Sequence, residues 1–257
     1  MFALERTGTE PAILFVHGFC QSSAYWAPSL DRIALHGVRG FAVDLPGFGA
    51  SAGATGPYTM AGLADALARE LDTRGVAHPI VLVGGSMGGV VAQHFTLRQP
   101  QRVARLLLVA TGGFTANVPL ALEKADALSA AAWNEAAITP VVNGFFYRSP
   151  SAAVLAEYRK IALSASQAAA IEAARSNATN RSFDDLASIR VPTMIIQGRH
   201  DSVRTPEHGM EMRERIPGSV LEVIEDAGHT PQLEQPQRFH DVALPFLLQG
   251  RARSPGT

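Results

Sequence analysis

A serine flanked by glycines is the first group in this chain that could carry out covalent chemistry. Residues 84–88 read Gly-Gly-Ser-Met-Gly and directly follow the apolar run 79–83. The pattern Gly-x-Ser-x-Gly is typical of a sharp strand-to-helix turn that exposes the serine hydroxyl, because glycines relieve crowding around a strained backbone. The apolar run predicts a strand, and residues 89–95 predict the start of a helix. Ser86 is therefore a candidate nucleophile, with an ordinary Gly- and Ser-rich turn as the alternative.

Two further groups lie where a serine nucleophile needs them. A serine hydroxyl is a poor nucleophile at neutral pH, so it requires a base, and the base requires a third group that fixes its tautomer. Asp201 follows a predicted strand at residues 193–197, and His229 follows another at residues 220–224. Both lie just beyond the carboxyl ends of strands, where open α/β sheets place their sites. The order Ser86, Asp201, His229 predicts a nucleophile, an orienting acid and a general base.

Other polar residues compete for the roles of acid and base. Asp226 lies three residues before the candidate base and is interpreted as a turn former, whereas Glu234 is interpreted as a surface or capping group. His200 adjoins Asp201, but adjacent side chains of an extended segment point apart, so His200 is expected to be structural. The acid could instead follow the predicted strand at residues 103–110, but the segment 111–117 after that strand contains no carboxylate. Asp201 is therefore the preferred acid.

Together these motifs resemble those of the α/β-hydrolase superfamily over nearly the whole chain. The residues that carry the resemblance are His17-Gly18-Phe19, Trp26, Asp44-Leu45-Pro46-Gly47-Phe48-Gly49, Ser51, Gly84 to Gly89, Gly198 to Asp201 and Gly228-His229. The resemblance implies that the backbone N–H groups of Phe19 and Met87 form an oxyanion hole. It also implies an α/β fold with a mostly parallel sheet of about eight strands flanked by helices, and a helical cap inserted after the sixth strand.

The pattern of predicted elements agrees with this fold. Predicted strands alternate with helical stretches, as in a parallel sheet. The strands are expected at residues 12–16, 40–43, 80–83, 103–110, 193–197 and 220–224. Leu63, Leu67 and Leu71 recur every four residues with charged residues between them, which predicts an amphipathic helix that packs on the sheet.

From about residue 114 to residue 189 the strand signal disappears and alanine becomes frequent. Helices are expected there near residues 120–133, 152–165 and 167–176. We therefore assign residues 1–113 and 191–250 to the hydrolase core, residues 114–190 to a helical cap and residues 251–257 to a short tail.

Aromatic residues of the cap are the main candidates for a substrate pocket. They are Trp133, Phe145, Phe146 and Tyr147, and Trp26 from the core is assigned to the pocket with them. Residues 143–144, Asn-Gly, predict a turn from which Phe145 and Phe146 project over Ser86. The alternative is that these rings only pack the cap helices against one another and against the sheet. The few charged residues nearby favour an uncharged or weakly anionic, fairly apolar substrate.

The composition is that of a compact enzyme without a strong charge. The chain has 257 residues, 47% of them hydrophobic, with 22 Lys and Arg against 23 Asp and Glu. This balance argues against a nucleic acid or an anionic membrane as partner. No signal peptide or membrane span is readable, and the single cysteine, Cys20, permits the cytoplasmic location that we expect. The histidines and glycines match neither a metal site nor a nucleotide-binding loop, so no metal and no cofactor is expected.

These residues predict a serine hydrolase that acts on a small molecule. Esters and lactones are the expected substrates, since an alkoxide-like leaving group needs the least catalytic assistance from the site. A carbon–carbon bond hydrolase is an alternative. The hydrolases of that kind that the chain resembles typically have Asn and Trp at two positions where this chain has Gly85 and Thr230. A cofactor-free perhydrolase similar to haloperoxidases is a second alternative, and a non-catalytic ligand receptor is a third.

Overall fold

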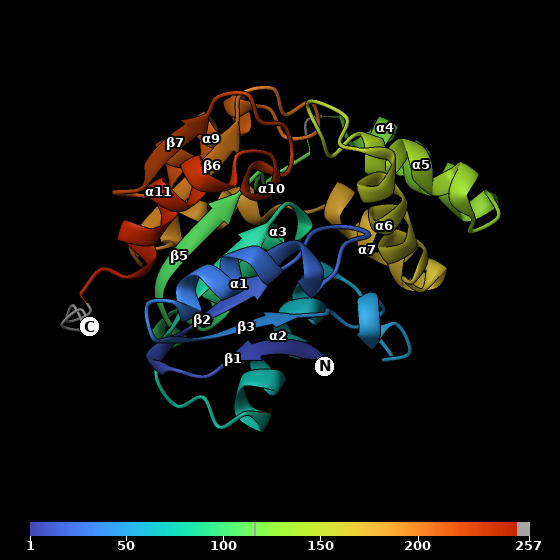
Figure 1. Ribbon diagram of the computed structural model, residues 1–257. Coiled ribbons are helices and arrows are strands. Elements are labelled where there is room, and N and C mark those ends of the chain that lie inside the picture. The colour runs from blue at the N-terminus through green and yellow to red at the C-terminus, as the bar shows by residue number, and fades with distance from the viewer. Residues whose placement is uncertain (116, 251–257) are drawn as a thin grey trace.

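The computed structural model describes residues 1–115 and 117–250, which are built around a twisted sheet (Figure 1). The described residues form seven strands in the order β1-β3-β2-β4-β5-β6-β7, and every neighbouring pair is parallel except β1 with β3. The strands are β1 (Ala3–Arg6), β2 (Thr9–Val16), β3 (Val38–Val43), β4 (Ile80–Gly85), β5 (Val103–Val109), β6 (Thr193–Gly198) and β7 (Val220–Ile224). Strand β4 is buried along its whole length, as expected for a parallel strand covered on both faces.

Helices cover both faces of the sheet. Helices α1 and α11 pack on one face, and α2, α3 and α9 pack on the other. Their bounds are α1 (Ala27–Ala34), α2 (Met60–Thr73), α3 (Met87–Arg98), α9 (Pro206–Arg215) and α11 (Pro236–Leu247), with the single turn α10 (Pro231–Glu234) before α11. The predicted amphipathic pattern lies on α2, where Leu63, Leu67 and Leu71 are buried. Among the described residues, no helix combines the length and apolarity that spanning a membrane requires.

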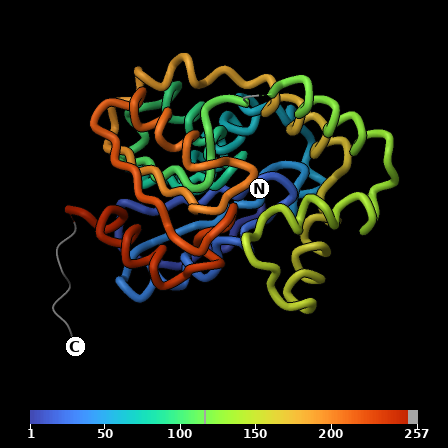
Figure 2. The backbone as a smooth tube through the Cα atoms, turned by 90° about the horizontal axis from the view of Figure 1, so that it is seen from above, coloured from blue at the N-terminus to red at the C-terminus, as the bar shows by residue number. Residues whose placement is uncertain are grey.

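Between β5 and β6 the chain forms five helices, which we call the helical insertion. They are α4 (Val118–Ala130), α5 (Glu135–Asn143), α6 (Ala152–Leu163), α7 (Gln167–Ala178) and the short α8 (Ser182–Asp185). Helix α4 packs on α7, and α5 packs on α6. Figures 1 and 2 show α4–α7 gathered on one side of the sheet, away from α11. Buried alanines on α7, including Ala169, Ala170 and Ala173, let neighbouring elements approach closely.

The expected mostly parallel α/β sheet with flanking helices is confirmed, but the strand count differs. Seven strands are described rather than the about eight that the resemblance implies, and the helical insertion follows the fifth strand rather than the sixth. Residues 9–16 form one strand, β2, whose pairing with β3 changes register between Thr9 and Ile13. The boundaries of core and cap stay predictions, and the assigned tail at residues 251–257 lies outside the described residues.

His17 connects the ends of two strands below the candidate site. The backbone N–H of Leu45 donates to His17 Nε2 (3.0 Å), so this nitrogen carries no proton and Nδ1 donates its proton to Gly18 O (2.7 Å). The ring is fully buried, and burial lowers the pKa of His17. A neutral imidazole with a fixed tautomer therefore holds the loop after β2 against the loop after β3.

Three histidines make the stability of the fold depend on pH. Burial is the main cause that lowers the pKa of His17, His208 and His240 below the ordinary value of 6.5. The unfolded chain therefore binds more protons than the folded chain just below pH 6.5. The free energy of unfolding is consequently highest above that pH and falls as the pH decreases. We expect the melting temperature to drop between about pH 7.5 and about pH 5.5, and His240→Gln to reduce the slope. A melting temperature constant over this range would contradict the assignment.

Candidate active site

Ser86 lies on the sharp turn between β4 and α3. Its backbone angles, φ 50° and ψ −120°, lie in a region that residues with a side chain rarely adopt and that costs about 1–3 kcal/mol. A Cβ atom at Gly88 would collide with the carbonyl oxygens of Val16 and His17. Glycine at this position therefore lets the end of β2 lie directly against the start of α3, next to the serine.

Two hydrogen bonds from a neighbouring part of the chain hold the strained serine in place. The Ser86 N–H donates to Val109 O (2.9 Å), and Thr111 Oγ1 donates to Ser86 O (2.6 Å). Gln197 Nε2 in turn donates to Thr111 O (2.8 Å). Sequence reasoning missed Thr111 and Gln197, because a lone threonine in a loop and a glutamine in a strand carry no recognisable pattern. Together they fix the turn from the ends of β5 and β6.

The structure brings Ser86, Asp201 and His229 together at the carboxyl edge of the sheet. His229 Nε2 lies 2.7 Å from Ser86 Oγ, and His229 Nδ1 lies 2.8 Å from Asp201 Oδ2. The side chains of Asp201 and His229 are 0% and 1% exposed, whereas Ser86 is partly exposed. Because the carboxylate accepts the Nδ1 proton, Nε2 is left with a lone pair that faces the serine hydroxyl. We call these residues the candidate triad.

The Asp201 carboxylate is held by its own loop. Its Oδ1 atom accepts the backbone N–H groups of Val203 and Arg204, both at 2.8 Å, which leaves Oδ2 aimed at the imidazole. The competing acid Asp226 instead forms an exposed ion pair with Arg148 (2.9 Å). Glu234, the other competing acid, receives backbone N–H groups rather than the imidazole proton. Of the three carboxylates, only that of Asp201 therefore bonds the imidazole of His229 directly.

The two backbone N–H groups predicted to form an oxyanion hole belong to residues close to Ser86. Met87 is the first residue of α3, so its N–H has no partner within the helix. Phe19 follows Gly18, which comes so close to the serine that a Cβ atom there would lie 3.0 Å from Ser86 Cβ. The loop is fixed because the Gly18 N–H donates to Gln21 Oε1 (2.9 Å). Within the described residues the Phe19 N–H has no hydrogen-bond partner, so both donors are free for a ligand.

Three of the five aromatic residues assigned to the pocket lie in the loop between α5 and α6. The ring of Phe145 is buried and stacks on the imidazole of the candidate triad, with centroids 6.0 Å apart and an interplanar angle of 28°. Phe146 packs on Tyr158 of α6 (5.4 Å between centroids). Tyr147 stacks on His200 (3.8 Å between centroids). Phe145 is thus the ring that borders the reacting groups, and the other two rings attach the loop to its surroundings.

The remaining two aromatic residues assigned to the pocket are tryptophans whose indole N–H groups bond backbone carbonyls. Trp26 is 1% exposed in the core, and its Nε1 donates to Val16 O (3.2 Å). Trp133 Nε1 donates to Leu163 O (3.2 Å), which joins the segment before α5 to the end of α6. An indole buries a large apolar area and also finds a partner for its N–H when it packs in this way. Both tryptophans therefore have packing roles, and their assignment to the pocket stays a prediction.

Comparisons with known proteins decide the family. The profile of the family described as alpha/beta hydrolase fold matches residues 11–236. The chain belongs to this family and is a hydrolase. Among its relatives, the 2-hydroxy-6-oxononadienedioate/2-hydroxy-6-oxononatrienedioate hydrolase of Burkholderia vietnamiensis is 32% identical, over 94% of this chain and 88% of its own length. The pimeloyl-[acyl-carrier protein] methyl ester esterase of Aeromonas salmonicida is 28% identical, over 95% and 98%.

A solved structure extends the comparison to three dimensions. The thermophilic esterase from Thermogutta terrifontis superposes with a TM-score of 0.86 at 31% identity, over 95% of this chain and 92% of the esterase chain. The names of these three proteins all denote hydrolysis but refer to different substrates. The reaction of this hydrolase therefore has to be argued from its own residues.

Tyr25 is a residue of this hydrolase that sequence reasoning missed. Its ring is 0% exposed and lies 6.3 Å from that of Phe145 and 4.6 Å from that of Tyr158, centroid to centroid. The hydroxyl is buried and has no hydrogen-bond partner among the described residues, and burial raises its pKa well above 10, so it stays protonated. Burial likewise raises the pKa of the neighbouring Cys20 thiol, which makes a second nucleophile here unfavourable.

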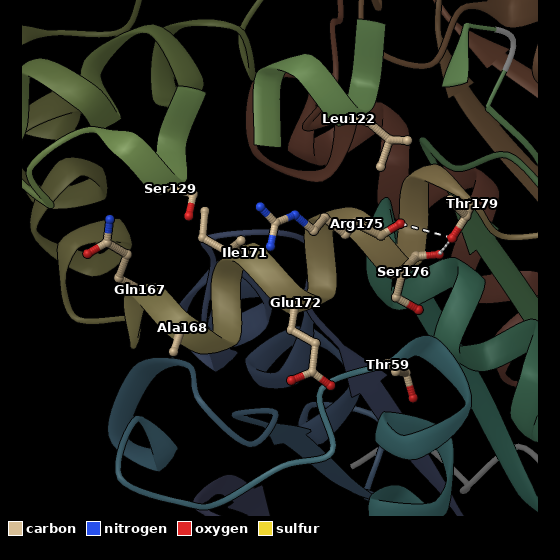
Figure 3. A pocket seen from close by; sticks show the side chains of 10 residues that line it. All are labelled: Thr59, Leu122, Ser129, Gln167, Ala168, Ile171, Glu172, Arg175, Ser176 and Thr179. Atoms are coloured by element: carbon tan, nitrogen blue, oxygen red, sulfur yellow. Dashed lines mark hydrogen bonds between the residues drawn. The ribbon is translucent and has the colours of Figure 1, made fainter. Parts of the chain in front are cut away.

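Two cavities of the hydrolase lie away from the candidate triad. One of about 820 Å³ runs along α7, where side chains such as Glu172 and Arg175 line it, and reaches Thr59 before α2 (Figure 3). The other, of about 360 Å³, lies beside the start of α8, and its lining residues include Phe114, Asn180 and Phe183. Neither cavity is lined by a member of the candidate triad, so neither is the place where Ser86 would react. Within the described ranges no cluster of three potential metal ligands is found.

The Asp201 carboxylate can be tested by an isosteric change. In Asp201→Asn the amide oxygen keeps the backbone bonds from residues 203 and 204, so the fold should persist. The amide NH₂ then faces His229 and favours the wrong tautomer, for which we expect about a 10⁴-fold loss in kcat. Ester hydrolysis and circular dichroism on the same variant give both quantities. Asp226→Asn is the control, and a loss confined to that variant would identify Asp226 as the acid.

Proposed function

We propose that this hydrolase cleaves a carboxylic ester or a lactone of a small, fairly apolar substrate through an acyl-enzyme on Ser86. The observation that carries the proposal is the hydrogen-bond chain from Ser86 Oγ through His229 to Asp201, next to two free N–H donors. Such a chain is the arrangement that activates a hydroxyl nucleophile. The small-molecule partner and the cytoplasmic location expected from the sequence stay predictions.

In the first half-reaction Ser86 Oγ attacks the substrate carbonyl carbon. His229 Nε2 takes the hydroxyl proton as the Oγ–C bond forms, and the Asp201 carboxylate stabilises the resulting imidazolium. The carbonyl oxygen becomes an oxyanion, which the N–H groups of Phe19 and Met87 are suited to bind. Removal of one donor of this kind typically raises the barrier by about 3–4 kcal/mol. The imidazolium then returns the proton to the leaving alkoxide as the ester C–O bond breaks.

In the second half-reaction water replaces the leaving group. His229 Nε2 removes a proton from the water while its oxygen attacks the acyl carbon, and the same two N–H groups receive the second oxyanion. Collapse of this intermediate breaks the bond to Ser86 Oγ and returns the proton to the serine. The products are a carboxylic acid and an alcohol, or a hydroxy acid from a lactone. Every proton moves through one imidazole nitrogen, so no other acid or base is needed.

The surroundings of Phe145 support a small and fairly apolar substrate. Ile138, Val142 and Ala162 of the helical insertion are buried in the same hydrophobic cluster as Phe145 and Tyr25. A polar or charged acyl group would lose its hydration there without gaining enough partners. The Tyr25 hydroxyl, which is buried without a partner in the described part of the chain, adds one donor to this apolar environment. We propose that the helical insertion acts as a cap over Ser86 and selects the acyl group through these side chains.

Cleavage of a carbon–carbon bond is the second candidate function, because one relative at 32% identity bears the name of a dienedioate hydrolase. The same nucleophile and base serve that chemistry. Two residues disfavour it, since this chain has Gly85 and Thr230 where the sequence resemblance to such enzymes calls for Asn and Trp. A panel of short esters, lactones and vinylogous diketones distinguishes the two candidates by their relative kcat/KM.

The nucleophile is tested directly with a fluorophosphonate probe. We expect the probe to label the unmutated chain at Ser86 and to leave Ser86→Ala unlabelled, with ester hydrolysis reduced by about 10⁴-fold or more. Ser164→Ala is the matched control, because Ser164 is exposed on the helical insertion and should leave labelling unchanged. Persistent labelling of Ser86→Ala would refute the proposed nucleophile.

The role of Phe145 in selectivity is tested by truncation. Phe145→Ala removes the ring that borders the imidazole, so bulky acyl groups should gain relative to short ones by about 10–200-fold in kcat/KM. Phe183→Ala is the control, because Phe183 also belongs to the helical insertion but packs on Phe114 and Arg215 instead. The control should lower the melting temperature and keep the selectivity ratio. If Phe145→Ala behaves in the same way, the ring only packs the insertion.

A further inference from the structure

Glu234, the last residue of α10, directs its carboxylate back toward the loop that carries His229. Its Oε1 atom accepts the backbone N–H of Gly228 (3.0 Å) and of Thr230 (3.2 Å). These are the residues on either side of His229. One carboxylate oxygen therefore fixes the backbone immediately before and after the candidate base, which restricts the directions in which the imidazole can point.

The other oxygen of the same carboxylate holds the helical insertion. Oε2 accepts the backbone N–H of Tyr147 at 2.7 Å, across 87 residues of sequence. Thr230 Oγ1 lies 3.1 Å from both Glu234 Oε1 and Phe145 O, so its single proton bonds one or the other. The approach is close enough that a Cβ atom at Gly228 would lie 2.6 Å from Tyr147 N. The segment 145–147 thus lies directly on the His229 loop.

This segment also contacts His229 and the residue before Asp201 through its rings. Phe145 stacks on His229, and Tyr147 stacks on His200, which directly precedes Asp201. Movement of residues 145–147 would therefore disturb the imidazole and the acyl side of the pocket at once. Only a carboxylate offers two acceptor oxygens with no competing donor, and here each oxygen serves a different part of the molecule.

We propose that Glu234 is a positioning residue that couples the helical insertion to the general base. It sets the orientation of His229 through Oε1 and the position of Phe145 over that ring through Oε2. The inference rests on the proposed function, because it assigns the acyl pocket and the base to these groups. It gives Glu234 a part in both rate and substrate selectivity, although the carboxylate does not touch the reacting atoms.

Two substitutions separate the two halves of this role. In Glu234→Gln the amide oxygen can keep the three donors at the Oε1 position, while the NH₂ group faces the Tyr147 N–H and that bond is lost. The rate of Ser86 labelling by a small fluorophosphonate should then stay within about threefold, while the ratio of kcat/KM for bulky and short esters shifts by about tenfold. Glu234→Ala removes both sets of bonds and should also slow labelling by about 10–100-fold.

Glu225→Gln is the matched control, because Glu225 follows β7 and forms only an exposed ion pair with Arg199. It should change neither the labelling rate nor the selectivity ratio. A purely structural role for Glu234 would lower the melting temperature without moving either readout, and that result overturns the inference. If Glu234→Ala does not fold, an unchanged selectivity ratio in Glu234→Gln overturns it equally. An unmutated chain that is not labelled refutes the proposed function, and this inference with it.

Discussion

The unfavourable backbone conformation of Ser86 is the constraint on which the rest of the site depends. It is imposed by the parallel pairing of β4 with β5, in which Gly85 lies opposite Val109, and by the two hydrogen bonds that reach Ser86 from Val109 and Thr111. Because β2, β4, β5 and β6 all run in the same direction, their carboxyl ends meet at one edge. The sheet therefore holds the strained turn and delivers the groups after β2 and β6 to the same place.

The candidate triad could be predicted from the sequence because each member has a local signal. Each of the three residues follows an apolar run and lies near a glycine. The positions of the strand ends and turns could therefore be predicted to within a few residues. The elements that were missed lack such signals. Strand β1 is a short, half-exposed edge strand, and helix α5 contains Pro140, a residue that ordinarily interrupts a helix. Their formation depends on tertiary contacts.

The pocket could be predicted only in part, because an aromatic ring gains similar apolar burial wherever it packs. Phe145 and Trp26 are both large aromatic side chains that are almost fully buried. One borders the imidazole and the other supports the core, and nothing in the local sequence distinguishes them. Tyr25, directly before Trp26, was not predicted to lie near the site for the same reason. Its unpaired hydroxyl becomes informative only once its neighbours are known.

The helical insertion is hydrogen-bonded to the core at several separate places, two of which lie near the candidate site. At its return to the sheet, Ser182 Oγ donates to Gln93 Oε1 (2.7 Å) on α3, and Asn180 Nδ2 donates to Gly113 O (2.9 Å). At its far end, the Glu234 carboxylate holds the segment 145–147 on the His229 loop. The bonds of Ser182 and Asn180 are buried or partly buried, so breaking them leaves polar groups without water, whereas the bond from Tyr147 to Glu234 is exposed. Displacement of the insertion relative to Ser86 must therefore break some of these bonds. If the insertion holds the acyl pocket as proposed, the distance between that pocket and Ser86 is controlled by residues such as Ser182 and Asn180, which do not contact the serine.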